Sequence, residues 1–286
     1  MADNLAGILY LVATPIGNLA DFSPRAVAVL QAVDFIGCED TRHSRPLLER
    51  YGIDKPLLAL HEHNEDGVSA RLLRRVAAGE SMALISDAGT PLINDPGFPL
   101  VRLAAEQGIK VVPVPGACAL VAALCASGLP ADRFAFEGFP PRTGPARRAL
   151  LAKLRDDTRT LVFYESSHRV LAFIEDIAAT FPADRPMAIA RELTKLHETI
   201  VRCAAGEAPA LMANDPYMEK GEFVVLLQGA PPVPAGEGLS AEQERVLALL
   251  LEACSVKSAV ALAVKITGAK RDAAYQAALR LAEKKV

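Results

Sequence analysis

Short apolar runs alternate with stretches of helical spacing through the first half of the chain. The runs are four to six residues long and occupy residues 8–13, 34–38, 57–60, 82–86 and 110–114. Continuous apolar runs of this length are typical of strands buried on both faces of a parallel sheet. Ser23 and Pro24 suit the start of an intervening helix, because serine caps helix amino termini and proline fits the first helical position. The pattern therefore predicts an α/β fold with a mostly parallel sheet that helices cover on both faces.

A second strand-rich set follows the turn-like segment Ser127–Asp132. Its apolar runs occupy residues 133–138, 160–165, 187–192, 199–203 and 222–228, with helical spacing at 146–154 and 168–180. We therefore expect two α/β domains of similar size, residues 1–128 and residues 129–232.

The segment from Gly229 to Gly238 concentrates proline and glycine, as linkers do. Beyond it the spacing is helical, over residues 242–253, 256–265 and 270–284, with a break at Thr267 and Gly268. The last two segments contain the apolar positions Val260, Val264, Tyr275, Leu279 and Leu281. We expect residues 239–286 to form a small helix-turn-helix-like module.

The stretch from Ser86 to Gly97 directly follows a predicted strand and is strongly polar. Its twelve residues include two glycines, two prolines, two aspartates, a serine, a threonine and an asparagine. A simple connection between strand and helix has roughly 2–6 residues, and open α/β sheets bind ligands at the carboxyl ends of their strands. We therefore predict a ligand-holding loop, with a long structural turn as the alternative.

Two other predicted strands of this half also end in polar residues. The first ends in Thr14–Leu19, where Gly17 allows the backbone to approach a ligand. The second ends in Glu39–His43, whose acids can accept ribose hydroxyls or act as a base, while Arg42 can bind a phosphate. A solvated, self-neutralising charge cluster is the alternative for this segment. Neither the first loop nor the Ser86 loop matches the dinucleotide or phosphate-loop glycine patterns, which argues against ordinary NAD or ATP use.

Polar side chains also lie at strand ends or starts in the second half. They are Tyr164, Glu165, His168, Arg191, Glu192, Lys195 and Glu222. Each alone is compatible with a surface ion pair, but polar strand ends in both halves predict a shared cleft. His61 and His63 would share one strand face, yet no further ligands are spaced to complete a site, so no metal is expected.

The composition favours a globular protein of a reducing compartment and argues against several other classes of protein. With 286 residues and 51% hydrophobic residues, the chain can fill two cores. Five widely spaced cysteines argue against a disulfide framework or a structural zinc site and fit a reducing cytoplasm. No secretory signal and no apolar run of about 20 residues is recognisable, so we expect no membrane partner.

The net charge of −3 gives no global attraction for a polyanion, so any nucleic-acid surface must be local. From Ser255 to Val286 there are seven basic residues against two acidic ones. The segment from Pro140 to Arg148 adds Arg142, Arg147 and Arg148. The absence of tryptophan and the presence of only five tyrosines argue against a base-stacking platform.

Taken together, the motifs resemble the tetrapyrrole (corrin/porphyrin) methylase family, and within it the bacterial branch that methylates small-subunit ribosomal RNA. The resemblance spans nearly the whole chain and rests on the order and spacing of TPIGNL, EDTRHS, LHEHNE, SDAGTPLINDPG, EGFPP, FYESSHR, ARELTK, KGEFV and ITGAKRDAAYQAAL. It implies two α/β domains with S-adenosylmethionine bound in the cleft between them, usually in a homodimer. It also implies methyl transfer to the ribose 2′-hydroxyl of a cytidine in the decoding region of 16S rRNA. The substrate is then either 16S rRNA or the small ribosomal subunit.

By analogy with the family, the resemblance also implies a set of contacts to the methyl donor. They are Pro15, Asp87, Gly89, Thr90, Ile93, Asp95, Ala117, Tyr164, Leu193 and Glu222. One departure is the pair Ala117 and Cys118, where the family commonly has P-G-P/V-x-A after the strand. At this point we expect a different packing against the cofactor, with its binding retained.

Methyl transfer from a sulfonium is an in-line displacement, so the enzyme must align the acceptor oxygen and help to remove its proton. Candidates for the base, or for a cation that stabilises the forming alkoxide, are Glu39, Asp40, Glu165, Glu192 and Lys195. Candidate substrate contacts are Arg42, Arg142, Arg147, Arg191, Lys270 and Arg271. Two other functions stay open: methyl transfer to a tetrapyrrole, and non-catalytic nucleic-acid binding without S-adenosylmethionine.

Overall fold

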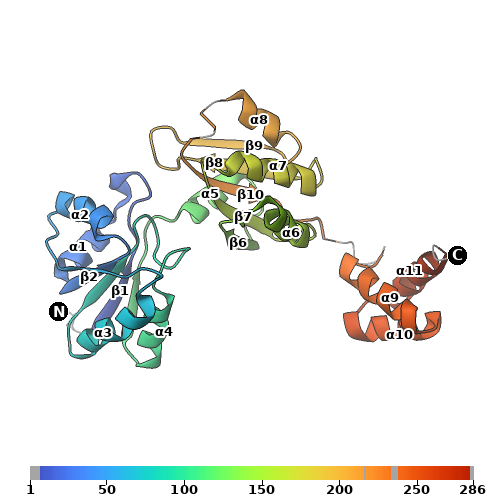
Figure 1. Cartoon of the computed structure of the whole chain (residues 1–286), viewed down its shortest axis with the longest axis horizontal. Coiled ribbons are helices and arrows are strands. Elements are labelled where there is room, and N and C mark those ends of the chain that lie inside the picture. Colours follow the sequence, from blue (N-terminus) through green and yellow to red (C-terminus); the bar gives the residue numbers. More distant parts are fainter. Residues whose placement is uncertain (1–6, 216, 219, 233–237, 284–286) are drawn as a thin grey trace. The chain divides into compact units, whose positions relative to one another are not determined.

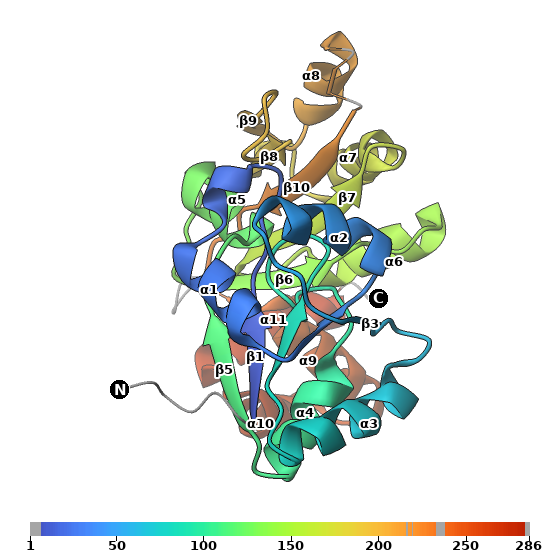
Figure 2. The ribbon, with the colours of Figure 1, turned by 90° about the vertical axis from the view of Figure 1, so that its left-hand side faces the viewer.

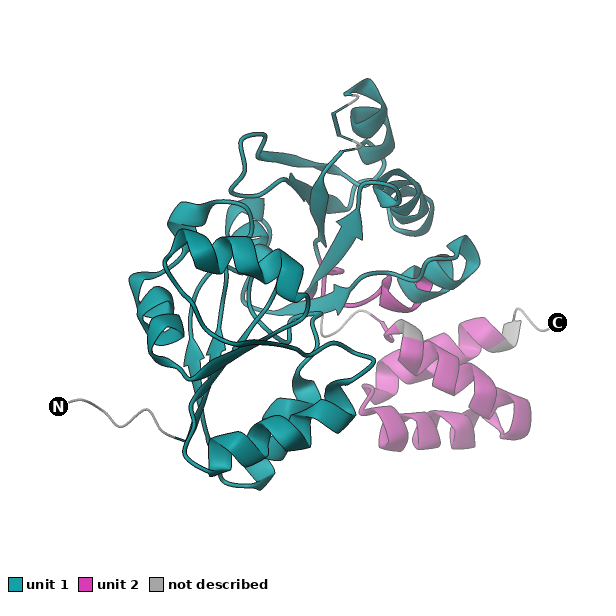
Figure 3. Ribbon diagram, turned by 60° about the vertical axis from the view of Figure 1, so that its left-hand side comes forward, with its two compact units in different colours: residues 1–151, 160–228 teal, residues 152–159, 229–286 magenta. Residues whose placement is uncertain are grey.

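The computed structural model describes residues 7–215, 217–218, 220–232 and 238–283. The chain divides into two compact units (Figure 3), residues 1–151 with 160–228 and residues 152–159 with 229–286. Both predicted sheets lie in the first unit, and the C-terminal helices lie in the second. The fold is therefore α/β with a helical C-terminal module, as the sequence pattern predicts.

The first sheet is entirely parallel, with strand order β3-β2-β4-β1-β5. Figure 1 labels its strands β1 and β2 and the helices α1 to α4. Its strands are β1 (Ile8–Val12), β2 (Phe35–Cys38), β3 (Leu57–Ala59), β4 (Met82–Ile85) and β5 (Lys110–Val114). The helices between them are the short 3-10 helix η1 (Leu19–Asp21), α1 (Pro24–Ala32), α2 (Thr41–Arg50), α3 (Glu65–Ala77) and α4 (Phe98–Glu106). The five predicted strands are thus confirmed.

Helices cover both faces of this sheet (Figure 2). On one face Tyr10 and Val12 of β1 pack with Leu30 of α1. On the other face Leu9 packs with residues of α3 and α4, including Leu72. Alternate residues of β1 thus enter two different cores, which is why its sequence is continuously apolar. The predicted start of α1 is also confirmed, since the Ala26 N–H donates to Ser23 Oγ at 3.1 Å.

The second sheet is mixed, with strand order β6-β7-β10-β8-β9. Its strands are β6 (Phe134–Gly138), β7 (Thr160–Ser166), β8 (Pro186–Arg191), β9 (Thr199–Ala204) and β10 (Glu222–Leu227). β6 and β7 pair in parallel, whereas the other neighbours are antiparallel. Helices α6 (Gly144–Leu154) and α7 (Val170–Thr180) match the predicted ones, and α8 (Ala208–Asn214) was not predicted from the sequence.

Helix α5 (Ala119–Ser127) follows the last strand of the first sheet but packs on the second sheet. Leu120 and Leu124 of α5 contact Val162, Ala190 and other residues of that sheet. The expected boundary after residue 128 therefore differs from the packing, because the apolar face of α5 is buried in the core of the following strands. Both sheets also fall in one compact unit rather than two.

The helical module consists of α9 (Ala241–Ala253), α10 (Val256–Thr267) and α11 (Arg271–Glu283). Its core is built mainly from small residues such as Ala259, Ala263 and Ala277. Tyr275 and Leu279 are 49% and 38% exposed, so the core does not use them. The predicted break is confirmed at Gly268, which ends α10 with a φ of +68°. Within the described residues, no helix combines the length and the apolarity that a bilayer span requires.

Candidate functional site

A pocket of about 330 Å³ lies in the first unit, within the roughly 300–1,000 Å³ typical of small-molecule sites. Residues after β1 and β4, at the amino end of α5 and on β7, β8 and β10 line it. The lining residues are Ile16, Asp87, Ala88, Gly89, Thr90, Ile93, Asn94, Asp95, Cys118, Ala119, Phe139, Tyr164, Glu165, Ser166, Ala190, Leu193, Glu222, Phe223 and Val224. Polar strand ends of both halves thus meet in one cavity, as the sequence predicts.

The loop after β4 holds one side of the pocket in a constrained backbone conformation. Leu92 and Asn94 have φ values of +70° and +66°, which cost energy for residues with a side chain. The Thr14 N–H donates to the Gly89 carbonyl at 2.9 Å, and the Gly89 N–H donates to Thr14 Oγ1 at 3.1 Å. These bonds fix Gly89 beside the end of β1, so the loop is a preformed wall of the pocket.

Four carboxylates line an otherwise largely apolar cavity: Asp87, Asp95, Glu222 and Glu165, of which Glu165 is paired with Arg169. Burial raises the pKa of Asp95, the hydroxyl of Ser86 lowers it, and the nearby Asp87 raises it further. The Asp87 carboxylate lies 3.3 Å from His43 Nδ1 and accepts a bond from the Asp40 N–H at 3.3 Å. Negative groups beside apolar walls suit a ligand that combines positive charge with an apolar body.

Tyr164 joins the pocket to the start of α5. Its hydroxyl accepts a hydrogen bond of 3.0 Å from the Leu120 N–H. Burial, with the thiol of Cys118 nearby, raises the pKa of Tyr164 to about 12, so its phenol is neutral at physiological pH. The rings of Phe136 and Phe139 meet the Tyr164 ring edge to face, with centroids 4.8 and 5.8 Å away.

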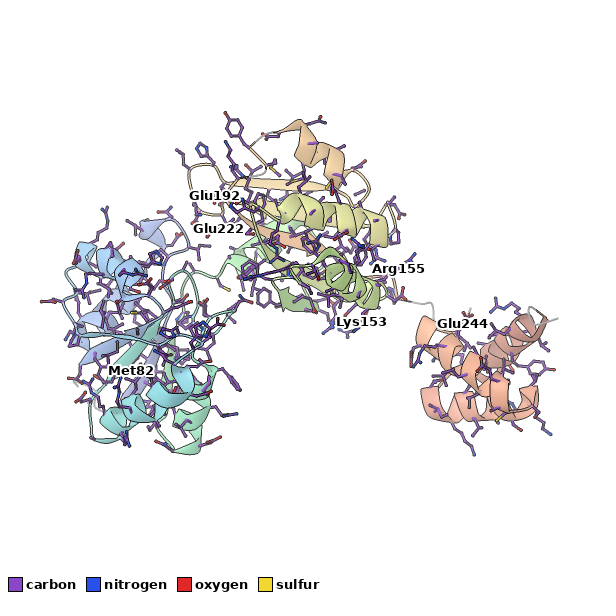
Figure 4. The ribbon with its side chains drawn as sticks, viewed as in Figure 1. Met82, Lys153, Arg155, Glu192, Glu222 and Glu244 are labelled. Atoms are coloured by element: carbon purple, nitrogen blue, oxygen red, sulfur yellow. The ribbon has the colours of Figure 1, made fainter. Side chains whose placement is uncertain are left out.

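Lys195 forms an ionic cluster with two glutamates at the edge of the pocket (Figure 4 labels both). Its Nζ lies 2.8 Å from Glu192 Oε1 and 2.8 Å from Glu222 Oε2. The Glu222 N–H also donates to Glu192 Oε1 at 3.0 Å. Since Glu222 lines the cavity, the cluster places an ammonium group close to the ligand space.

Two glycines leave room for this cluster. A Cβ on Gly17 would lie 2.4 Å from Lys195 Cγ, and one on Gly221 would lie 2.5 Å from Glu192 Cγ. Glu192 and Thr194 have φ values of +50° and +66°. In the part of the chain that the structure describes, all four non-glycine residues with positive φ belong to the two loops beside the pocket. Such local strain is characteristic of functional sites.

The ionic cluster predicts a specific pH dependence of stability. Burial works against ionisation of Glu192, but bonds from Lys195 and the Glu222 N–H outweigh it and lower its pKa. An acid whose folded pKa is lowered stabilises the fold above its unfolded pKa and loses this contribution as the pH falls. We expect E192Q to have a lower thermal midpoint than wild type at pH 7, with the gap closing below the ordinary glutamate value of 4.5. Calorimetry across this range checks it, and a gap independent of pH would contradict it.

Glu165 lines the pocket and is 2% exposed. Its Oε2 lies 3.0 Å from the Arg169 guanidinium, and its Oε1 accepts a bond of 2.8 Å from the Ser166 N–H. Burial raises the pKa of Glu165, and these partners lower it only in part. Its carboxylate therefore ties the end of β7 to Arg169 at the wall of the cavity.

The sequence-predicted residues divide into those that the pocket gathers and those that it does not. Eight of the ten predicted methyl-donor contacts line the pocket, while Pro15 and Ala117 do not. Ala117 instead accepts a bond of 3.0 Å from Thr90 Oγ1 through its carbonyl. Among the predicted catalytic candidates, Glu165 lines the pocket and Glu192 and Lys195 belong to the ionic cluster.

Glu39 and Asp40 do not line the pocket. Asp40 caps α2, since its Oδ1 accepts a bond of 2.8 Å from the Arg42 N–H, and its carboxylate also holds the Arg42 guanidinium. These bonds lower the pKa of Asp40 and make a poor base of it. Glu39 is exposed at the end of β2.

Two of the predicted substrate contacts are buried inside the fold. Arg147 is 6% exposed and its Nε donates to Asp176 at 2.6 Å, whereas Arg191 is 7% exposed and donates to the carbonyls of Lys220 and His197. Because these guanidinium groups are buried and bonded to other groups of the fold, we do not propose them as substrate contacts. Arg142, Lys270 and Arg271 are exposed, and Arg42 is exposed but paired with Asp40.

Sequence reasoning missed pocket residues that have no chemical signature of their own. Ile16, Phe223 and Val224 read as ordinary core residues, and Phe139 appears only within the EGFPP motif. Among the described residues, no group of three or more His, Cys, Asp and Glu side chains is arranged to hold a metal ion.

Two family models match the chain. The model described as Tetrapyrrole (Corrin/Porphyrin) Methylases matches residues 8–209, and the RsmI C-terminal HTH domain matches residues 237–282. Two similar curated proteins are both named Ribosomal RNA small subunit methyltransferase I. The protein of Xylella fastidiosa (strain Temecula1) is 52% identical over 94% of this chain and 98% of its own. The protein of Escherichia coli O157:H7 is 50% identical over 97% of this chain and 96% of its own.

Solved structures of low identity share the fold. Cobalt precorrin-4 methyltransferase has a TM-score of 0.56 at 18% identity and covers 78% of this chain and 95% of its own. Uroporphyrin-III C-methyltransferase from Thermus thermophilus, complexed with S-adenyl homocysteine, has a TM-score of 0.50 at 18% identity and covers 76% of this chain and 96% of its own. The chain therefore belongs to the tetrapyrrole methylase family, and within it to the ribosomal RNA small subunit methyltransferases I.

Proposed function

We propose that this chain transfers a methyl group from S-adenosylmethionine to the ribose 2′-hydroxyl of a cytidine in the decoding region of 16S rRNA. The observation behind the proposal is the pocket of the first unit, where carboxylates face apolar walls, in a member of the rRNA methyltransferase family. The position of the methylated atom and the identity of the nucleotide come from the family resemblance.

The donor set of the pocket fits S-adenosylmethionine. Asp87, Asp95 and Glu222 offer negative charge to its sulfonium and amino groups, and Ile93 and Leu193 offer apolar surface to its adenosine part. When bound, S-adenosylmethionine supplies a methyl group on a positively charged sulfur, which is an electrophile without help from a metal. The Thermus thermophilus uroporphyrin-III C-methyltransferase was solved in complex with S-adenyl homocysteine, and this supports a ligand of the same class for the fold.

The chain's own residues must orient the ribose and stabilise its oxygen as the hydroxyl proton leaves to solvent. A ribose hydroxyl is a weak acid, so a nearby cation that stabilises the forming alkoxide is useful. We assign this role to Lys195, whose Nζ is held at 2.8 Å by both Glu192 and Glu222 at the pocket edge. Burial alone would lower the pKa of Lys195, but its two carboxylate partners raise it and keep it charged.

A direct assay tests the function. Labelled S-adenosylmethionine is supplied with small ribosomal subunits, naked 16S rRNA or a porphyrinogen, and the labelled atom is mapped by nuclease digestion and mass spectrometry. We expect label on a ribose 2′-oxygen of a cytidine in one of the two RNA substrates. Label on a base, or on the porphyrinogen alone, would reject the proposal.

The helical module is proposed to bind rRNA phosphates together with Arg142. Lys270 and Arg271 are exposed around the start of α11, and the segment from Ser255 onward is strongly basic. Phosphate contacts displace counterions, so each one steepens the dependence of affinity on salt.

Substitution of these two basic residues tests the RNA contact. We expect K270E/R271E to weaken binding to small subunits and to reduce the slope of log affinity against log salt by about 2, with S-adenosylmethionine affinity unchanged. Filter binding across a salt series measures the slope. Lys110, exposed at the start of β5, supplies the matched control K110E. An unchanged slope in K270E/R271E would exclude the contact.

The resemblance also implies a homodimer, and the five widely spaced cysteines fit a reducing cytoplasm. We include both in the proposal, and light scattering coupled to size-exclusion chromatography measures the oligomeric state.

A further inference from the structure

Phe139 presents an exposed aromatic ring on the wall of the pocket. The residue is 47% exposed, whereas Phe163 in the neighbouring strand is completely buried. The other aromatic residues of the lining are less exposed: Tyr164 is half-buried and Phe223 is 2% exposed. Phe139 is a phenylalanine, so the low tryptophan and tyrosine content of the chain does not exclude stacking on its ring.

The backbone on the amino side of Phe139 is fixed by a bulge. The pairing register between β6 and β7 shifts between Phe136 and Gly138. Gly138 has a φ of +65°, and a Cβ there would lie 2.8 Å from Asn94 Oδ1. Bulges of this kind redirect side chains next to functional sites. Phe139 directly follows this irregularity and lines the pocket.

The backbone on the carboxyl side is held by a hydrogen bond from an ion-paired arginine. The Pro140 carbonyl accepts a hydrogen bond from the Arg169 guanidinium, which also lies 3.0 Å from Glu165 Oε2. Pro140 is buried, and the Phe139 ring packs edge to face on Tyr164 at 65°. The exposed ring is therefore held in place before any ligand binds, which lowers the entropy cost of stacking.

Arg142 is a cation on the same short segment, three residues beyond Phe139. Its side chain is exposed, and within the described ranges it forms no ion pair. An aromatic ring and a cation so close in the chain match a nucleotide, which has a base to stack and a phosphate to pair. S-adenosylmethionine offers an adenine and a carboxylate instead, so its affinity for the Phe139 variants distinguishes the two ligands.

We propose that Phe139 stacks on the base of the target nucleotide while Arg142 contacts a neighbouring phosphate. The inference rests on the proposed function and deepens it by naming the residues that hold the target nucleotide outside its RNA stack. A base that is drawn away from its neighbours loses stacking energy, and an aromatic side chain restores part of it.

Three variants of Phe139 test the proposal. F139L keeps an apolar side chain without a π face, F139A removes the side chain, and F139Y restores an aromatic ring. Phe98, 63% exposed in α4 and absent from the pocket lining, supplies the control F98L. The measurements are KM for small ribosomal subunits, the dissociation constant for S-adenosylmethionine by calorimetry, and the thermal midpoint.

We expect F139L and F139A to raise KM for the subunits by about 5- to 150-fold, which corresponds to the binding energy of one stacked base. The affinity of both variants for S-adenosylmethionine should stay within about twofold of wild type. F139Y should restore KM to near the wild-type value, and F98L should not change it. Weakened S-adenosylmethionine affinity in F139L would assign the ring to the adenine and overturn the proposal. Unchanged KM in F139L and F139A would overturn the stacking proposal as well. If wild type methylates the RNA in the same experiment, the proposed function stands even when the stacking proposal fails.

Discussion

D176A is expected to lower the free energy of unfolding by about 3–5 kcal/mol. Asp176 of α7 accepts bonds from Arg147 Nε at 2.6 Å and from Arg148 at 3.1 Å, and Arg147 also donates to the Ala172 carbonyl. The side chains of Arg147 and Asp176 are 7% and 10% exposed. Loss of the carboxylate would leave a buried guanidinium without its counter-charge, which is the costly way to break such a pair.

Urea unfolding followed by circular dichroism measures this effect, because the chain has no tryptophan for fluorescence. Glu175, exposed on the same helix, supplies the control E175A, which should change stability by less than about 0.5 kcal/mol. The double variant R147M/D176L removes both charges, so it should recover most of the loss. If R147M/D176L folds stably but has a KM for ribosomal subunits raised more than tenfold, Arg147 binds substrate after all.

The fold is predictable from the sequence because burial leaves a local signal. Leu9 and Tyr10 enter cores on opposite faces of the first sheet, and this two-sided burial makes the run apolar throughout. Helix α5 shows the limit of this signal. Its small apolar residues predict a buried helix, but they do not predict which of the two sheets it packs against. The short helix α8 was also not predicted, because its seven residues are too few to show a clear helical period of hydrophobic positions.

The candidate site was predictable where polar residues follow apolar strands directly. Asp87, Asp95 and Glu222 meet in the pocket because the loop after β4 and the start of β10 converge there. Asp40 has the same local pattern, yet its carboxylate caps α2 and holds Arg42. Sequence spacing gives the residue types at a strand end, but helix capping and ion pairing in three dimensions decide which of them face a ligand.

G17A is expected to lower kcat/KM for methyl transfer by about 100-fold, the effect of a displacement of about 1 Å at a reacting centre. Gly17 has a φ of +149°, and an added Cβ would lie 2.4 Å from Lys195 Cγ and 3.0 Å from Lys195 Cε. The lysine must move away from this contact. Its Nζ then leaves the two carboxylates that hold it at 2.8 Å, and the ammonium no longer lies at the pocket edge.

A double-mutant cycle separates this effect from backbone strain. In the K195A background the atoms that collide with residue 17 are absent, so G17A should lower kcat/KM much less than it does in wild type. G67A is the matched control, since a Cβ on Gly67 meets nothing within 4 Å. Unfolding curves of each variant report the strain that the positive φ imposes on alanine. Additive effects of G17A and K195A on kcat/KM would show that Gly17 does not act through Lys195, and Gly17 would then matter for its backbone alone.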